Sequence, residues 1–292
     1  STTREALACQ EGYSPYSLDC RGRTLALGER THVMGILNVT PDSFSDGGSC
    51  CDPGLAVEKA CLMVAGGADI IDLGGESTRP GYSPVNEAEE LARIMPVLKR
   101  LVNEIHVPVS IDTTKARVAR QALEAGAHII NDQRGLQGDP AMAGVAAEYG
   151  APLVLMHNQK GTSYRELIGD IVEYFRESIR LAEQAGVVRE KLIIDPGFGF
   201  GKTPQQNLEL LRRLKDLRCL GLPVLIGSSR KSTIGKVLDL PVDQRLEGTA
   251  ATVAVAIVNG AAIVRVHDVR EMVRVARMTD AIMRIEKWDF KA

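Results

Sequence analysis

The 292-residue chain is 45% hydrophobic and 25% charged, a composition typical of a globular protein with ample length for a large core. Its 35 basic and 37 acidic residues give a formal net charge of −2, which disfavours nucleic-acid and anionic-membrane partners. We find no apolar run of membrane-spanning length and no signal-peptide pattern. We therefore expect a cytoplasmic protein that acts on small molecules. Its six cysteines show no CxxC or metal-ligand spacing, so we expect free thiols.

The first predicted element is a β-hairpin at residues 16–27 (YSLDCRGRTLAL) that turns at Arg21 and Gly22. We expect it to cap the N-terminal end of the fold. We expect a single domain overall, made of an extension with the hairpin, residues 1–30, and the main fold, residues 31–292.

Short apolar runs then alternate with helical segments along the rest of the chain. Within residues 166–185, for example, apolar residues recur at steps of three or four and so share one helical face. Strands are expected at 32–39, 67–72, 107–113, 126–132, 150–157, 191–197, 222–229 and 260–267. Helices are expected at 52–66, 86–105, 114–125, 140–149, 166–185, 204–218, 243–259 and 269–286. Eight apolar strands separated by helices favour a closed (β/α)8 TIM barrel, with a doubly wound α/β sheet as the alternative because periodicity does not reveal closure.

A polar residue follows or closes nearly every apolar run. The set is Asn38, Asp72, Asp112, Asn131, His157, Asp195, Ser229, Arg265 and His267. Buried polar groups cost free energy unless they find a partner, so a core alone does not explain the repetition. In a barrel these ends meet at the C-terminal mouth, where catalytic residues gather. For any single member, the role of an ordinary helix N-cap is an alternative.

The residue types in this set indicate a ligand. Asp112, Asn131 and Asp195 supply compact hydrogen-bond acceptors for the edge of a planar heterocycle that presents N–H groups. Cations for phosphate or carboxylate come from Arg230, Lys231, Arg265 and His267, although Arg230 and Lys231 taken alone could be surface charges. We interpret His106 and His128, which lie outside these ends, as structural or solvent-facing.

Residues 195–203 (DPGFGFGKT) resemble a phosphate-binding P-loop at first sight. That motif requires glycine five residues before the glycine of Gly-Lys-Thr, and here the position holds Pro196. We therefore interpret the glycines as freedom for a tight loop beside a flat ligand, with Phe200 packing near it. Lys202 and Thr203 would lead into the next helix, and Asp195 would face the ligand.

Seven motifs together resemble the dihydropteroate synthase family of (β/α)8 enzymes. They are VMGILNVTPDSFSDGG (33–48), ADIIDLGGESTRPG (68–81), SIDT (110–113), HIIND (128–132), LIIDPGFGFGK (192–202), GSSRKS (227–232) and IVRVHD (263–268). The resemblance implies a transferase of the folate pathway that condenses 6-hydroxymethyl-7,8-dihydropterin diphosphate with 4-aminobenzoate. It also implies Mg2+ as cofactor, a homodimer and a sulfonamide target.

The resemblance also assigns roles residue by residue. The pterin would be held by Asp112, Asn131, Asp195 and Lys231, with Met156 beside it. Arg265 would cover a pterin face and reach the diphosphate, and Asp112 would stabilise a cation at the pterin methylene. The catalytic residues expected are Asp112, Lys231, Arg265 and His267.

For the diphosphate and the second substrate, the resemblance places Asn38, Thr78 and His267 near the phosphates, with Asn38 as the protein ligand to Mg2+. Ser229, expected at the start of a helix, would meet the carboxylate of 4-aminobenzoate. Loops carrying Arg79, Pro80 and Phe44 would close over the ring.

Two positions depart from the family pattern: Asn158, where methionine is common, and Gln133, where an aliphatic residue is common. Two other functions stay open at this point. One is a pterin-dependent methyltransferase that acts with a corrinoid protein, and the other is a catalytically inactive pterin-binding protein.

Overall fold

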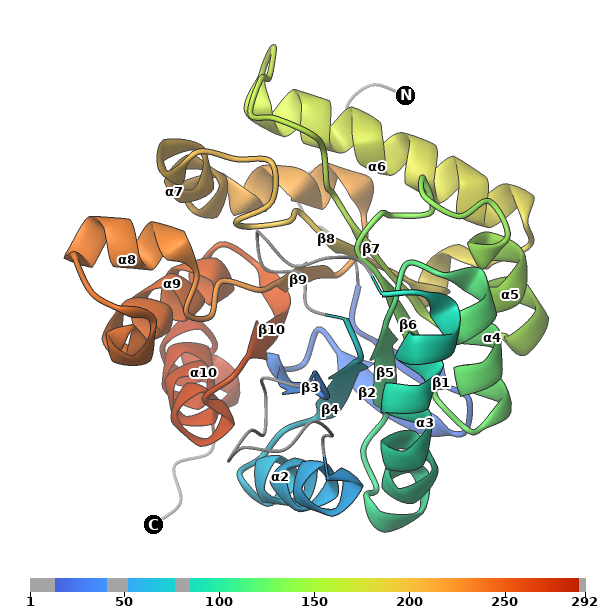
Figure 1. Ribbon diagram of the computed structural model, residues 1–292. Helices are drawn as coiled ribbons and strands as arrows, with labels where there is room; N and C mark the ends of the chain where they lie inside the picture. Colours follow the sequence, from blue (N-terminus) through green and yellow to red (C-terminus); the bar gives the residue numbers. More distant parts are fainter. Residues whose placement is uncertain (1–13, 41–51, 77–84, 289–292) are drawn as a thin grey trace.

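The computed structural model describes residues 14–40, 52–76 and 85–288. In this part of the chain, eight parallel strands close into a barrel in the order β10-β3-β4-β5-β6-β7-β8-β9, with helices around it (Figure 1). The strands are β3 (His32–Asn38), β4 (Ile70–Gly74), β5 (Val109–Asp112), β6 (Ile129–Asp132), β7 (Leu153–Met156), β8 (Leu192–Asp195), β9 (Val224–Ile226) and β10 (Ala261–Val266). The predicted (β/α)8 barrel is confirmed, and the doubly wound sheet is wrong.

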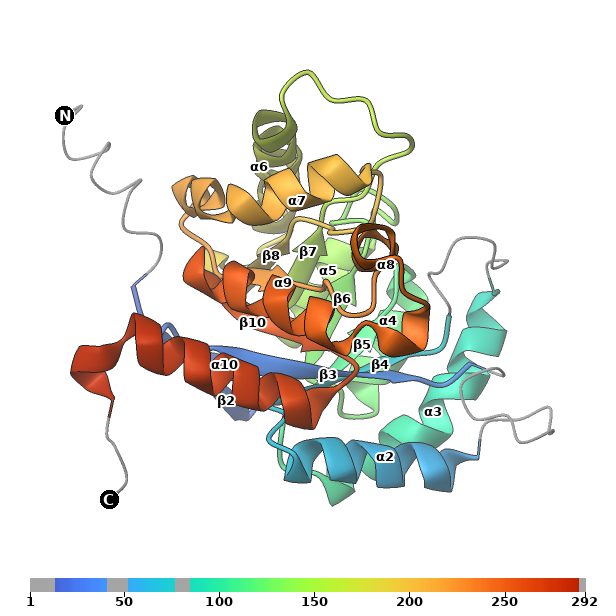
Figure 2. The same cartoon turned by 90° about the vertical axis from the view of Figure 1, so that its left-hand side faces the viewer.

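The helices form an outer layer around the strands (Figure 2). They are α2 (Pro53–Ala65), α3 (Glu87–Glu104), α4 (Ala116–Glu124), α5 (Met142–Tyr149), α6 (Leu167–Gln184), α7 (Pro204–Arg212), α8 (Ser232–Leu238), α9 (Leu246–Val258) and α10 (Val269–Met283). Short 3₁₀ segments are η2 (Arg189–Lys191), η3 (Leu214–Leu220), η4 (Val242–Gln244) and η5 (Ile285–Lys287). None of the described helices is both long enough and apolar enough to cross a membrane.

The helix predicted at residues 204–218 ends earlier than expected. It stops at Arg212, and the 3₁₀ segment η3 continues the chain. The three buried leucines of η3, Leu214, Leu217 and Leu220, are spaced by three, which is the period at which side chains align in a 3₁₀ helix. The apolar pattern therefore changes from the α-helical period to the 3₁₀ period within one predicted helix.

The strands place apolar and polar side chains in separate layers of the barrel interior. Because side chains alternate between two faces of a strand, Ile71 and Leu73 pack outward with the helices while Ile70 packs inward. The inward layer near the N-terminal end is apolar and includes Ile70, Ile129, Val154, Ile193, Leu225 and Ile263. Two residues further along the same strands stand Asp72, Asn131, Met156, Asp195, Gly227 and Arg265. Because every second side chain of a strand faces inward, the polar residues form the next inward layer, at the C-terminal mouth of the barrel.

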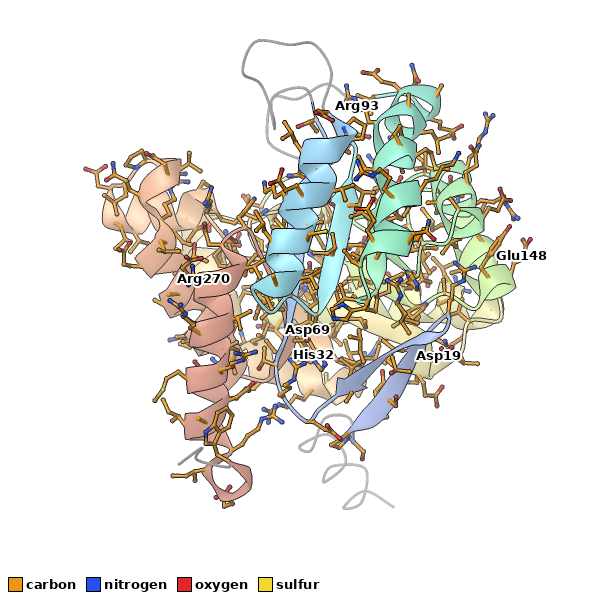
Figure 3. The ribbon with its side chains drawn as sticks, turned by 90° about the horizontal axis from the view of Figure 1, so that it is seen from below. Asp19, His32, Asp69, Arg93, Glu148 and Arg270 are labelled. Carbon is orange, nitrogen blue, oxygen red and sulfur yellow. The ribbon has the colours of Figure 1, made fainter. Side chains whose placement is uncertain are left out.

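The predicted hairpin is confirmed and closes the opposite end of the barrel. Strands β1 (Tyr16–Cys20) and β2 (Arg23–Leu27) pair antiparallel, and Arg21 and Gly22 both have positive φ, as a tight two-residue hairpin turn requires. Buried hairpin side chains join the inward apolar layer. The Arg21 guanidinium donates to the Leu123 carbonyl at 3.0 Å. Figure 3 shows this end of the molecule, with Asp19 on the hairpin.

Candidate active site

A small polar pocket opens at the C-terminal mouth of the barrel. Its lining includes six residues predicted from the sequence to bind substrate: Asn131, Met156, Asp195, Phe200, Lys231 and Arg265. The lining also includes Gln133, Gly197, Phe198 and Gly227, which sequence reasoning did not assign to a ligand. The cavity volume is only about 10 Å³, so the lining side chains lie close together.

Arg265 connects two buried carboxylates beneath the pocket. Its Nε donates to Asp72 Oδ2 at 2.7 Å, and its Nη2 donates to Asp112 Oδ2 at 2.9 Å. Asp72 is fully buried, so this arginine compensates charges that water does not reach. The fork of the guanidinium therefore has a fixed orientation at the centre of the mouth. The sequence identified Asp72 as a strand-end residue but did not reveal that it anchors Arg265.

Asn131 presents an unused acceptor to the interior of the site. Its Nδ2 donates to Asp72 Oδ2 at 3.0 Å, while its Oδ1 is buried and receives no hydrogen bond from the described residues. Asp72 Oδ1 on β4 and the Ser110 hydroxyl on β5 are likewise buried without a hydrogen-bond partner among the described residues. A buried acceptor without a donor costs free energy. The site is therefore suited to a ligand that brings N–H groups.

Asp112, beneath the pocket, and Asp195, in its lining, both have elevated pKa values. Burial raises the pKa of Asp112 to about 7, although Arg265 and a hydrogen bond from Gln133 oppose this shift. Burial also raises the pKa of Asp195 to about 6, opposed first by the hydrogen bond from the Gly197 amide to Asp195 Oδ1 at 2.8 Å. Both pKa values thus lie near neutral pH, and shifts of this kind are common in functional sites.

Glycines in the loop 196–203 allow it to pass very close to the loop after β7. Gly197 has φ of 70° and Gly201 has φ of 57°, a region that side chains disfavour. A Cβ on Gly197 would lie 2.0 Å from the His157 carbonyl oxygen, and one on Gly201 would lie 2.5 Å from the Gln159 carbonyl oxygen. The packed loop brings the Phe200 ring to 4.2 Å from Lys231 Nζ, a cation–π contact at the pocket.

The predicted convergence of strand-end residues is wrong for His157. Its side chain lies behind the pocket, where the ring contacts Tyr174 edge-on at 4.7 Å between centroids. The buried Lys202 ammonium is 3.0 Å from His157 Nδ1 and donates to the carbonyls of Gly197 and Phe200 at 3.1 Å each. His157 follows Met156 by one residue and therefore points to the other side of the strand. Thr203 caps α7 in a capping box, so the transition into a helix was predicted correctly, whereas the buried role of Lys202 was missed.

Lys202 should make the stability of the protein depend on pH. Burial lowers the pKa of Lys202 to about 7 in the folded protein, well below that of an exposed lysine. Between these values the unfolded chain binds a proton that the folded chain lacks, so stability rises with pH. From pH 7 to pH 9 the wild type should gain about 2 kcal/mol more in the free energy of unfolding than Lys202→Met. Urea titrations at both pH values test this, with the exposed Lys99→Met as the control. Parallel wild-type and Lys202→Met profiles would contradict it.

Ser229 and His267 form a pair at the ends of β9 and β10. The His267 backbone amide donates to Ser229 Oγ at 3.1 Å, and Ser229 Oγ lies 2.9 Å from His267 Nδ1. The direction of the second contact depends on the imidazole tautomer; we assign the hydroxyl as the donor to Nδ1, an assignment that puts the imidazole proton on Nε2. Burial, followed by the charge of Arg265, lowers the pKa of His267 to about 3. A pKa this low favours the neutral imidazole, and the expected role of His267 near the phosphates stays a prediction.

Two other expectations for the segment 227–232 need correction. Ser229 is not at the start of a helix, because α8 begins at Ser232. The backbone of Arg230 has positive φ, and its guanidinium is paired with Asp268, with Nε 2.9 Å from Oδ2. Arg230 is therefore held by Asp268 and is not part of the pocket lining, whereas Lys231 is the cation of this segment that lines the pocket.

Asn38, the expected Mg2+ ligand, lies at the end of β3 and is half-buried. A Cβ built on Gly74 would meet Asn38 Oδ1 at 3.3 Å and Asp112 Cβ at 3.5 Å, so both side chains lie against this glycine. The described residues contain no group of three or more His, Cys, Asp or Glu side chains that could hold a metal. Four predicted loop residues lie outside the described residues: Phe44, Thr78, Arg79 and Pro80.

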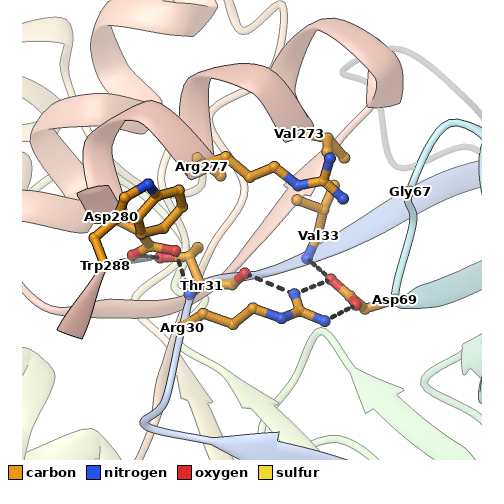
Figure 4. A pocket seen from close by; sticks show the side chains of 10 residues that line it. Arg30, Thr31, Val33, Gly67, Asp69, Val273, Arg277, Asp280 and Trp288 are labelled. Atoms are coloured by element: carbon orange, nitrogen blue, oxygen red, sulfur yellow. Dashed lines mark hydrogen bonds and ion pairs between the residues drawn. The ribbon is translucent and has the colours of Figure 1, made fainter. Parts of the chain in front are cut away.

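A larger cavity, of about 450 Å³, lies between β3 and α10, toward the end of the barrel at which the strands begin (Figure 4). Its polar groups are mostly bonded to one another. Arg30 Nη2 is 2.6 Å from Asp69 Oδ1, and Thr31 donates from both its amide and its hydroxyl to Asp280. This cavity lies away from the strand ends that carry the polar set. Size alone therefore does not identify the active site.

A (β/α)8 barrel with buried acceptors and a fixed arginine at its C-terminal mouth has the features of a small-molecule binding site. The family of pterin binding enzymes matches residues 34–267. The chain belongs to the dihydropteroate synthase family within this class, as its relatives establish. It is 54% identical to dihydropteroate synthase from Clostridium beijerinckii over 88% of this chain and 96% of the relative. For the Bacillus subtilis enzyme the identity is 51% over 89% and 91%.

Solved structures agree with this assignment. A dihydropteroate synthase from Clostridium difficile, crystallised in the presence of pteroic acid, superposes with a TM-score of 0.87 at 54% identity, covering 89% of this chain and 99% of that one. The Xanthomonas albilineans enzyme in complex with 7,8-dihydropteroate gives a TM-score of 0.86 at 41% identity, with coverage of 92% and 99%. The family predicted from the seven sequence motifs is confirmed.

Proposed function

We propose that the protein condenses 6-hydroxymethyl-7,8-dihydropterin diphosphate with 4-aminobenzoate, giving 7,8-dihydropteroate and pyrophosphate. The observation that carries the proposal is the pocket in which Asn131 Oδ1 and the Asp195 carboxylate stand beside the fixed guanidinium of Arg265. Acceptors of this kind fit the amino and ring N–H groups of a pterin. A flat ring between them would lie against Met156 and Phe200.

The groups that would receive the leaving diphosphate are Arg265, Lys231 and His267. Arg265 and Lys231 line the pocket, and cations held in place before the reaction stabilise charge that develops on a leaving group. His267 would contribute an Nε2–H hydrogen bond rather than a charge. Ser229 stays a predicted partner of the aminobenzoate carboxylate, which would compete with His267 for the single hydroxyl proton.

Asp112 would act on the other side of the bond that breaks. An arylamine is neutral near pH 7, so the amine needs no strong base to attack, and departure of pyrophosphate is the difficult step. As that bond lengthens, positive charge builds on the pterin methylene, and an ionised Asp112 stabilises it. Arg265 orients this carboxylate through the 2.9 Å bond from Nη2.

The mouth of the barrel offers oxygen ligands, which suit Mg2+, but few protein groups, so the ion would also need ligands from substrate and water. Mg2+ prefers hard oxygen ligands and commonly keeps water and substrate phosphates with one or two protein groups. Asn38 Oδ1, next to Asp112 over Gly74, is the protein ligand that we propose. When bound, the ion would supply positive charge to the diphosphate.

The proposal is tested by incubating the protein with both substrates and Mg2+. We expect pyrophosphate release and a product of the mass of 7,8-dihydropteroate, and we expect neither when 4-aminobenzoate is omitted. Failure to form this product under these conditions would refute the synthase activity. Methyl transfer from methyltetrahydrofolate to a corrinoid protein would support the methyltransferase instead, and pterin binding without either reaction would support an inactive pterin-binding protein.

Two further expectations belong to the same proposal. The support for a homodimer is a set of exposed apolar side chains on α9 and α10, two helices that pack against each other; they are Val255 and Val258 of α9 and Met278 and Ile282 of α10. Exposed apolar groups that cluster are typical of interfaces. A cytoplasmic location stays a prediction.

A further inference from the structure

Gln133, which lines the pocket, contacts Asp112 beneath it, and the reaction described above does not use this contact. Its Nε2 lies 2.8 Å from Asp112 Oδ1 and 2.8 Å from Asp112 Oδ2. Both side chains are buried, with 6% and 8% exposed, so water competes little for these bonds. The amide nitrogen therefore spans the carboxylate, and Arg265 holds Oδ2 from a second direction.

The chain folds so that Gln133 has this orientation before any ligand arrives. Asn131 faces the barrel interior, Asp132 faces outward, and Gln133 faces inward again, as the strand period requires. Asp132 accepts backbone hydrogen bonds from Arg134 at 2.9 Å and Leu136 at 2.8 Å, which fixes the turn immediately after Gln133. The glutamine is thus held at the base of a rigid turn.

We propose that Gln133 is a positioning residue for the transferase reaction, acting through Asp112 and resting on the function proposed above. With donors from Gln133 and Arg265, the carboxylate has one orientation, and a carboxylate fixed before the reaction stabilises a developing cation better than a mobile one. Gln133 itself contacts neither reacting atom in this scheme. Its contribution should therefore appear in the chemical step and should disappear when Asp112 is changed.

The test replaces Gln133 with methionine, which keeps the length of the side chain and removes the amide. In Gln133→Met we expect kcat to fall about tenfold, the loss expected for hydrogen bonds to a charged group. The KM for each substrate should stay within about twofold. The matched control is Gln137→Leu, which removes another amide from the same turn, one that bonds Tyr174 O and Ser178 Oγ at 3.2 Å outside the pocket. This control should retain wild-type kcat.

A double-mutant cycle separates positioning from a structural role. In an Asp112→Asn background, single-turnover rates with excess enzyme should change less than twofold on adding Gln133→Met, because the partner through which Gln133 acts is altered. An equal loss in both backgrounds, or a rise in KM at unchanged kcat, would overturn the inference. An active wild type with a fully active Gln133→Met would also refute it while leaving the proposed function intact. An inactive wild type would refute the function itself.

Discussion

Replacing Arg265 with methionine should destabilise the fold as well as abolish the reaction. Asp72 and Asp112 would be left as two buried carboxylates that no longer share a guanidinium, whose nitrogens now lie 2.7 and 2.9 Å from their oxygens. Removing one partner of a buried ion pair costs about 3–5 kcal/mol, because a charge stays buried and uncompensated. We expect the free energy of unfolding in urea at pH 7.5 to fall by about this amount. Turnover should fall below detection.

The matched control for this experiment is Arg213→Met. Arg213 contacts three carboxylates, those of Glu166, Glu209 and Asp216, and so has more ion pairs than Arg265. These pairs lie at the surface, however, where water and salt screen them and where one ion pair contributes about 0–1 kcal/mol. Equal losses of stability in the two variants would show that burial does not govern the Arg265 pairs.

The fold was predictable because each strand and helix carries its own local signal. A Gly-Ala pair before a short apolar run recurs along the chain. The glycines of these pairs, Gly67, Gly126, Gly150 and Gly260, all have positive φ, the backbone conformation that commonly ends a helix. The spacing of three in Leu214, Leu217 and Leu220 also occurs on one face of an α-helix, so it did not by itself locate where α7 gives way to η3. That boundary depends on how Leu214, Leu217 and Leu220 pack against the core, which is a tertiary effect.

The candidate site was predictable as a set of residues but not as a set of contacts. A polar residue two positions after an inward apolar residue faces the mouth, so Asn131, Asp195 and Arg265 could be identified from the strand period. The sequence does not indicate which carboxylates Arg265 contacts. Asp72 and Asp112 are both aspartates at strand ends, and their distances from Arg265 depend on how the barrel closes. Likewise, His157 ends an apolar run yet points outward. The interior or exterior position of a side chain just past a strand depends on the exact strand end, the least certain feature of any sequence-based prediction.

Asp195→Asn should weaken binding of the pterin diphosphate strongly, although it replaces only one oxygen by nitrogen. Asp195→Asn replaces an acceptor-only group with one that also donates, and Asp195 Oδ1 already receives the Gly197 amide. Losing two charge-assisted hydrogen bonds to the pterin should cost about 3 kcal/mol or more, which corresponds to at least about a hundredfold weaker binding. Calorimetric titration with the pterin diphosphate at pH 8 measures this loss.

The pH dependence of the same titration identifies the cause. Because burial raises the pKa of Asp195 to about 6, the wild type has the charged acceptor at pH 8 and loses it as the pH falls below 6. Wild-type affinity should therefore fall toward that of Asp195→Asn between pH 8 and pH 5, whereas the variant should depend less on pH. Asp170→Asn is the control, since Asp170 also accepts a backbone amide, from Arg165 at 2.7 Å, but lies on α6 away from the pocket lining. Wild-type binding by Asp195→Asn at pH 8 would remove this carboxylate from the pterin site.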